Sequence, residues 1–214
     1  MKIFKLITAF LFTVSFIYSQ SGGVLYLSSE MLNESNNKYV SGKDLDGYWR
    51  FSSKPLDPAN IDLSFMRDSL FSSFDKDVAK WKGYGWFVIQ IKAEDFLKGK
   101  VIGMRIWHSG ASRIYFDGKK IAEFGNPSKE SSSETRFNAQ GVPFGVFINN
   151  DSLHTLAVEY SHFISSAELN NFAELATKPG FRIIVSDLDN SLHSINENEL
   201  YKTIDIVYLG LIFS

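Results

Sequence analysis

The side chains best suited to bind a ligand stand at the ends of short apolar runs. Trp107 and His108 close one run, Arg113 opens the next, and Tyr160 and His162 follow a later one. An aromatic ring can stack on the C–H face of a sugar while neighbouring charged or imidazole groups hydrogen-bond its hydroxyls. We therefore take these five residues as the candidate ligand-binding set.

Each candidate also has a simpler structural interpretation. Aromatic side chains commonly fill a protein core, and an arginine on a strand commonly forms a surface ion pair. Core packing is the stronger expectation for Trp49 and Trp86, which together with Tyr84 are the alternative stacking residues. For Trp107 the two interpretations are balanced, because its apolar neighbours in the strand pattern fall on the opposite face.

The sequence contains no arrangement typical of catalysis. The four histidines lack the spacing of a zinc protease helix, and neither a nucleophile elbow nor a glycine-rich phosphate loop is present. Glu94 and Asp95 are adjacent, so on a strand they would point apart. Residues 187–191 offer oxygen ligands but lack the glycine and distal glutamate of a calcium loop. We expect no catalytic residue, no metal and no cofactor.

The overall composition limits the kind of protein that the chain can form. It has 214 residues, 44% of them hydrophobic, and a formal net charge of −2. This length and apolar fraction can support a packed core, which excludes a wholly disordered chain. Because the chain has no cysteine, a disulfide scaffold is also excluded. The balanced charge, with no long basic run, argues against nucleic acid as a partner.

Both ends of the chain are more apolar than its middle. Lys2 and Lys5 precede an apolar run over residues 6–17, which predicts a signal peptide cleaved after Ser19. An uncleaved anchor is the alternative, although this run is shorter than the ~20 residues of a full membrane span. Residues 206–213 form a second uncharged run, which we interpret as the start of a membrane helix. A buried last strand is the alternative there.

Between the two ends, short alternating apolar runs are separated by turn residues. Phe87, Ile89 and Ile91 fall on one face at period two. Asp117-Gly118 between two such runs predicts a type I′ hairpin, because that turn needs positive φ at both central residues. Regular short strands of this kind predict an all-β sandwich or barrel. The predicted strands span residues 48–51, 86–92, 101–108, 113–116, 119–124, 142–148, 154–160 and 181–185.

Other stretches carry weaker signals. Residues 20–45 are polar and are expected to be loosely ordered, with 24–27 as a candidate edge strand. Residues 61–81 and 167–177 each have some helical character, and the latter stretch is followed by a Pro-Gly stop signal. Residues 126–138 are polar and serine-rich, which predicts a flexible surface loop.

The order of these segments resembles the galactose-binding-like jelly rolls. The resemblance is carried by residues 83–87, 99–106, the hairpin 111–125 and residues 154–161. In the sugar-binding domains of family 2 glycoside hydrolases, a Gly-x-x-Trp-Tyr strand precedes a Tyr-x-Asn-Gly-Lys hairpin, and this chain has Phe87 and Asp117 instead of the second Tyr and the Asn. The chain is more similar to the extracellular domain of bacterial seven-transmembrane receptors with diverse intracellular signalling modules. In that family the jelly roll follows a signal peptide and leads into the first membrane helix.

The resemblance, which covers about residues 46–213, implies an all-β fold, a galactose-binding-like jelly-roll β-sandwich. The expected organisation is a signal peptide over 1–19, a loosely ordered segment over 20–45, a jelly-roll ligand-binding domain over 46–199, and the truncated start of the first transmembrane helix over 200–214. The expected function is ligand sensing, without enzymatic activity, by the periplasmic or extracellular input domain of an inner-membrane signalling protein such as a sensor histidine kinase. An output kinase, cyclase or phosphatase would lie beyond Ser214.

The resemblance also implies the expected partners. The ligand would be a carbohydrate or another small molecule, and the membrane would be contacted through the C-terminal segment. A homodimer is a further possible partner. Two alternatives stay open as well. One is a carbohydrate-binding jelly-roll module or fragment of a secreted glycoside hydrolase, in which residues 206–213 would form a buried strand. The other is a stand-alone structural protein of the cell envelope.

Overall fold

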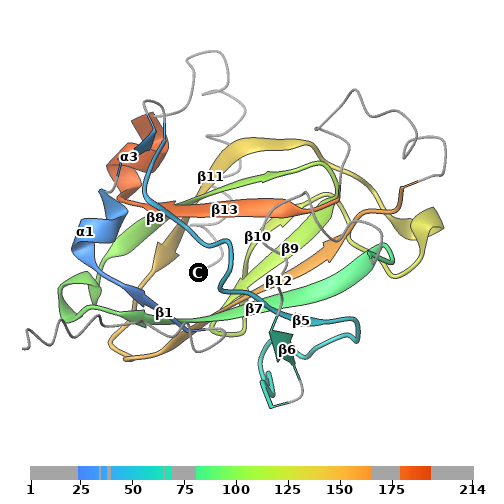
Figure 1. Cartoon of the computed structure of the whole chain (residues 1–214), viewed down its shortest axis with the longest axis horizontal. Helices are drawn as coiled ribbons and strands as arrows, with labels where there is room; N and C mark the ends of the chain where they lie inside the picture. The colour runs from blue at the N-terminus through green and yellow to red at the C-terminus, as the bar shows by residue number, and fades with distance from the viewer. Residues whose placement is uncertain are drawn as a thin grey trace, which may run out of the picture.

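The computed structural model of the chain describes residues 24–33, 35–37, 40–64, 66–68, 81–164 and 179–193. This part forms two β-sheets that pack face to face (Figure 1). The predicted all-β sandwich is therefore confirmed. The predicted signal peptide, the helical stretch 167–177 and the C-terminal segment 200–214 lie outside the described residues.

The larger sheet has the strand order β10-β9-β12-β7-β5-β6. Along the free edge of β7, β5 pairs antiparallel with the first half and β1 pairs in parallel with the second half. The strands are β1 (Val24–Leu27), β5 (Arg50–Ser52), β6 (Arg67–Asp68), β7 (Tyr84–Ala93), β9 (Ala111–Phe116), β10 (Lys119–Phe124) and β12 (His154–Ser161).

The smaller sheet has the order β11-β8-β13-β4, with every neighbouring pair antiparallel. Its strands are β4 (Lys43–Asp44), β8 (Val101–His108), β11 (Ala139–Phe147) and β13 (Phe181–Ser186). The remaining elements are α1 (Ser29–Leu32), α3 (Leu188–His193), the paired strands β2 (Ser35–Asn37) and β3 (Val40–Ser41), and the 3₁₀ turns η2 (Asp95–Leu97) and η3 (Ser131–Ser133).

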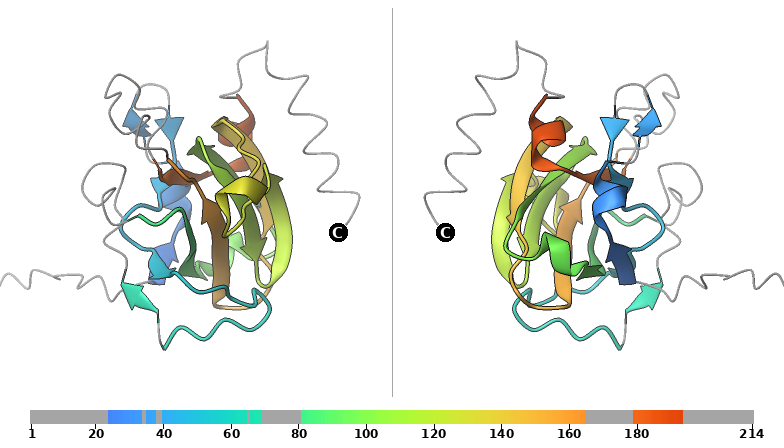
Figure 2. Two further views of the ribbon diagram at one scale, coloured as in Figure 1. Left: turned by 90° about the vertical axis from the view of Figure 1, so that its right-hand side faces the viewer. Right: turned by 90° about the vertical axis from the view of Figure 1, so that its left-hand side faces the viewer.

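The two ends of the sandwich differ in what closes them (Figure 1). One end, called the helical end below, carries α1, η2, α3 and the connection between β11 and β12; it faces the viewer in the right panel of Figure 2. The opposite end, called the loop end, carries the β8–β9 turn, the connection over residues 125–138 and Gly180. The two ends therefore present different elements to the solvent.

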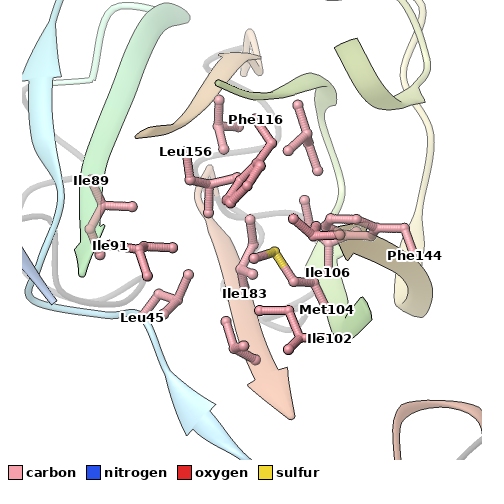
Figure 3. Packing of buried hydrophobic residues seen from close by; sticks show 14 of the residues in the cluster. Leu45, Ile89, Ile91, Ile102, Met104, Ile106, Phe116, Phe144, Leu156 and Ile183 are labelled. Atoms are coloured by element: carbon pink, nitrogen blue, oxygen red, sulfur yellow. The ribbon is translucent and has the colours of Figure 1, made fainter. Parts of the chain in front are cut away.

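Apolar side chains from both sheets meet between the layers (Figure 3). Ile89 and Leu156 come from the larger sheet, Met104, Ile106 and Ile183 come from the smaller one, and all five are fully buried. Side chains alternate faces along a strand, so the period-two apolar pattern directs these residues inward. Burying an aliphatic side chain of this size stabilises the fold by roughly 1.5–3 kcal/mol.

The strands predicted from alternation are all present, with shifts of a few residues at their ends. The Asp117-Gly118 hairpin is confirmed as well, because φ is 48° at Asp117 and 80° at Gly118. Asp117 also fastens the turn to the neighbouring strand β12. Its carboxylate accepts a hydrogen bond from the backbone N–H of Thr155 at 2.8 Å and lies 2.7 Å from His154 Nδ1.

The N-terminal stretch differs from the loose order expected over residues 20–45. In the described part of it, β1 extends the larger sheet, and β4 pairs with β13 at the edge of the smaller one. Leu25, Leu27 and Leu45 are buried in the main core. The packed domain therefore begins well before residue 46. The candidate edge strand over 24–27 is present because its two leucines alternate onto the inner face.

A second, smaller apolar cluster covers the outer face of the larger sheet. Trp86 and Val88 of β7 and Ala157 of β12 pack there against Met66. Leu56, Ile61 and Leu63, from the connection between β5 and β6, are partly buried against the same cluster. This connection therefore shields part of the outer face from solvent.

Candidate functional site

The five candidate ligand-binding residues lie towards the loop end, but in three different layers. Trp107 is partly exposed on the outer face of the smaller sheet, and Arg113 is partly exposed on the outer face of the larger one. His108, Tyr160 and His162 are buried, with 3%, 1% and 2% of their surfaces exposed. The structure brings these three together and separates them from Trp107 and Arg113.

The three buried residues form a hydrogen-bonded network with Ser112 and Gly180. The rings of His108 and Tyr160 are 5.8 Å apart, and Ser112 Oγ lies 2.9 Å from His108 Nε2. The Tyr160 hydroxyl accepts from the Gly180 N–H at 2.9 Å, donates to the Gly180 carbonyl at 3.0 Å, and lies 3.3 Å from His162 Nδ1. The network joins β8, β9, β12 and the residue before β13. It positions the loop end and offers no open ring face to a ligand.

Burial keeps two members of this network, His108 and Tyr160, uncharged. Burial lowers the pKa of His108 to about 3, and the nearby imidazole of His162 lowers it further, against a backbone hydrogen bond with Gly110. Burial also raises the pKa of the Tyr160 hydroxyl, because an isolated phenolate would lose its hydration. Both side chains are therefore neutral near pH 7, which suits an interior position.

Arg113 is held by three neighbours on the outer face of the larger sheet. Its Nε lies 2.7 Å from Glu123 Oε1, its Nη1 lies 3.0 Å from Glu159 Oε2, and its Nη2 donates to Asn126 Oδ1. Asn126 in turn donates to the carbonyl of Ser133 at 3.1 Å. Arg113 thus forms the surface ion pairs of the simpler interpretation and ties the connection over residues 125–138 to the sheet.

The three alternative stacking residues have little open surface. Trp49 is in the main core, with its ring 5.2 Å from that of Phe181. Trp86 is in the outer cluster, and its Nε1 donates to the Tyr84 hydroxyl at 2.8 Å. Tyr84 then donates to Glu159 Oε1 at 2.8 Å. The expected core packing is confirmed for Trp49, whereas Trp86 is buried in the smaller cluster on the outer face of the larger sheet.

Trp107 has polar neighbours on both sides. In the strand register it pairs with Gln140 of β11 and with Arg182 of β13. Gln140 is exposed, and Arg182 Nε donates to Asp44 Oδ2 at 2.6 Å. We call Trp107, Gln140, Arg182 and Asp44 the Trp107 face. It places a partly exposed indole between an amide and a guanidinium–carboxylate pair.

A β-bulge shapes this face. The β11–β8 register shifts between Gln140 and Val142, and the intervening Gly141 has φ +73°. A Cβ atom at Gly141 would lie 2.8 Å from the Trp107 indole, so the glycine lets the backbone pass against the ring. Sequence reasoning identified Trp107 but not Gln140, Arg182 or Asp44, since these neighbours depend on strand register.

The serine-rich connection over residues 125–138 is fastened at several points. Asn126 and Thr135 exchange backbone hydrogen bonds of 2.8 and 3.1 Å, and the Phe137 N–H donates to the Gly110 carbonyl at 2.8 Å. The Glu134 carboxylate accepts from Ser161 Oγ at 2.7 Å. This connection is therefore a hydrogen-bonded part of the loop end and not the flexible loop that the polar sequence predicts.

The described ranges hold neither a metal-binding cluster nor a membrane-spanning helix. Among those residues, no group of three or more His, Asp or Glu side chains is placed to hold a metal ion. No helix among them is long and apolar enough to cross a membrane.

No family model and no characterised protein sequence matches this chain. Similar solved structures include a Bacteroides uniformis β-glucuronidase, with TM-score 0.46 and 19% identity over 67% of this chain and 17% of that one. A glycosyl hydrolase family 2 member from Bacteroides cellulosilyticus has TM-score 0.46 and 9% identity over 68% of this chain and 20% of that one. A family 2 β-galacturonidase from Eisenbergiella tayi has TM-score 0.39 and 13% identity over 67% of this chain and 24% of that one.

The chain thus spans about a fifth of the length of these enzymes. Likenesses this distant transfer neither a substrate nor a catalytic role. The function of this chain has to be argued from its own surface.

Proposed function

We propose that this chain is a non-catalytic carbohydrate-binding domain of an exported protein, and that the Trp107 face is its binding surface. The carrying observation is the partly exposed indole of Trp107 between Gln140 and the Arg182–Asp44 pair. Of the other candidates, His108, Tyr160 and His162 are buried. Arg113 is engaged with acidic and amide partners.

The chemistry of the Trp107 face matches that of a sugar ring. The indole can stack on the C–H side of a pyranose. The Gln140 amide both donates and accepts hydrogen bonds, while Arg182 donates and Asp44 accepts. A sugar hydroxyl also does both, so it can pair with any of these groups beside the bonds that Gln140 makes to Asn138 and Arg182 makes to Asp44. Because the face lies on a sheet surface, we expect it to bind one side of an oligosaccharide or of a terminal sugar.

We expect Trp107→Ala to weaken carbohydrate binding about 10-fold, equivalent to roughly 1.4 kcal/mol of lost stacking. A glycan array with neutral and uronic sugars would identify a ligand, and calorimetry would measure its affinity. The matched control is Phe147→Ala, which removes an exposed aromatic ring from the same outer sheet face at the opposite end. Unchanged affinity in Trp107→Ala, or an equal loss in both variants, would contradict the assignment of the binding surface.

A second candidate function is ligand sensing by a membrane-attached receptor. It is supported by the uncharged apolar run over residues 206–213, which begins 13 residues after the end of α3 at His193. In this interpretation the sugar-binding sandwich is the input domain of a signalling protein. The ligand could shift the receptor only by binding two states of the domain with different affinity.

Membrane attachment can be tested separately from sugar binding. We expect the whole chain to co-sediment with phospholipid vesicles, and Leu209→Lys with Ile212→Lys to release it, because each buried lysine opposes insertion by ~2.5–3.5 kcal/mol. A chain that stays in the supernatant before substitution favours the glycoside hydrolase module. The coding sequence after Ser214 provides an independent check, since membrane helices and a kinase, cyclase or phosphatase module would follow in a receptor.

A further inference from the structure

Exposed apolar side chains are concentrated at the helical end. Eight large hydrophobic residues of the described chain are exposed, and six of them lie on or beside the elements that close this end. Phe96, in η2, is 63% exposed, and Phe147, the last residue of β11, is 57% exposed. The other four are Tyr26 of β1, Val101 at the start of β8, Leu153 before β12 and Leu192 of α3.

Strand pairing places several of these residues side by side. Phe147 and Val101 are register partners on the outer face of the smaller sheet. The backbone ladder continues beyond them, with hydrogen bonds between Ile148 and the turn residues Gly99 and Lys100. The Lys100 ammonium lies over the Phe96 ring, 3.0 Å from its centroid. The helical end therefore combines apolar tips with a lysine beside an aromatic ring, an arrangement in which the lysine can keep its charge in water.

The last helix of the described residues, α3, also lies at this end. β13 runs to Ser186 at the helical end and α3 follows there (Figures 1 and 2). In the sequence, residues 194–205 separate α3 from the apolar run over 206–213. Twelve residues can span at most ~43 Å when fully extended, at 3.6 Å per residue. If residues 206–213 enter a bilayer, the end of α3 lies within ~43 Å of its surface.

From these observations we infer that the helical end rests on a phospholipid bilayer, with Phe96, Phe147 and Leu153 dipping into the interfacial layer. The inference rests on the membrane attachment proposed above. Charge favours a zwitterionic surface, because acidic and basic side chains are mixed here: Asp95, for instance, pairs with Lys98 at 2.7 Å. Apolar insertion then provides the attraction, so the contact should be insensitive to salt, unlike adhesion of a basic patch.

The absence of cysteine from the chain makes this contact directly testable. A single cysteine at Leu153→Cys carries an environment-sensitive fluorophore at the helical end, and Glu130→Cys carries the same label at the exposed loop end. The whole chain is mixed with phosphatidylcholine vesicles, with and without spin-labelled lipid. We expect a several-fold gain in emission and strong quenching at position 153, and neither change at position 130. Phe96→Asp with Phe147→Asp should abolish both signals, with urea denaturation as the folding control.

Each remaining outcome is decisive. If the chain binds vesicles but the labels at positions 153 and 130 both stay in water, the bilayer contact is wrong and the membrane attachment still holds. Shielding of position 153 without vesicles, accompanied by a doubled mass in light scattering, overturns it in favour of a second copy of the chain. A chain that does not bind vesicles overturns both the contact and the attachment. Calorimetry on the same sample, with the sugar that the glycan array identifies, measures binding at the Trp107 face. Sugar binding and the bilayer contact are therefore tested by separate measurements.

Discussion

Replacing Gly125 by alanine is expected to lower the free energy of unfolding by about 3–4 kcal/mol, whereas the same substitution at Gly99 lowers it by about 1 kcal/mol. Both glycines have φ +75°, so the backbone strain imposed by a side chain is matched. They differ in what the added methyl group would meet. At Gly99 no atom of the described residues lies within 4 Å of the position that a Cβ atom would take, whereas at Gly125 that position falls well inside van der Waals distance of the Thr135 carbonyl oxygen.

The clash at Gly125 would spread through the loop end. The Thr135 carbonyl accepts the Asn126 N–H at 2.8 Å, so displacing it breaks the link between the start and the end of this connection. Arg113 donates one of its hydrogen bonds to Asn126, so a displaced Asn126 would also weaken the position of Arg113. Urea denaturation followed by tryptophan fluorescence, on both variants at one temperature, measures the difference. Equal losses in the two variants would show that backbone strain alone matters and that this connection tolerates displacement.

The strands of the sandwich could be predicted because their signal is local. Alternation over four to eight residues identifies a strand and its inner face, and Asp117-Gly118 identifies the hairpin between β9 and β10. β1 and β4 carry too few residues for alternation to be convincing. Their pairing with β7 and β13 joins segments more than 60 residues apart in the sequence. Such contacts depend on the whole topology, which short-range patterns do not contain.

The candidate site was predictable to the same extent. Alternation correctly placed Trp107 on the face opposite Ile106. The same rule could have placed His108 inside, because it shares the face of Ile106, and Tyr160 inside, because it shares the face of Val158. Gln140 and Arg182 flank Trp107 because of the strand register. The register of β11 with β8 includes a bulge here, which cannot be predicted from the local sequence.

The buried network also predicts how stability responds to pH. The pKa of His108 is about 3 in the folded protein and about 6.5 as an ordinary histidine. Between these two values the unfolded chain binds a proton at this position and the folded one does not. The contribution of His108 to the free energy of unfolding is therefore complete above pH 6.5 and falls by ~1.4 kcal/mol for each pH unit below it, until pH 3.

The variant His108→Gln isolates this contribution from the titration of carboxylates. Glutamine can still hydrogen-bond the Ser112 hydroxyl that lies 2.9 Å from His108 Nε2, but it does not titrate. We expect the wild-type chain to lose about 2 kcal/mol relative to the variant between pH 6.5 and pH 5, by urea denaturation at each pH. A stability difference that stays constant over this range would mean that His108 takes up its proton in the folded state. The buried His108 imidazole would then need a compensating charge or a water molecule close to it.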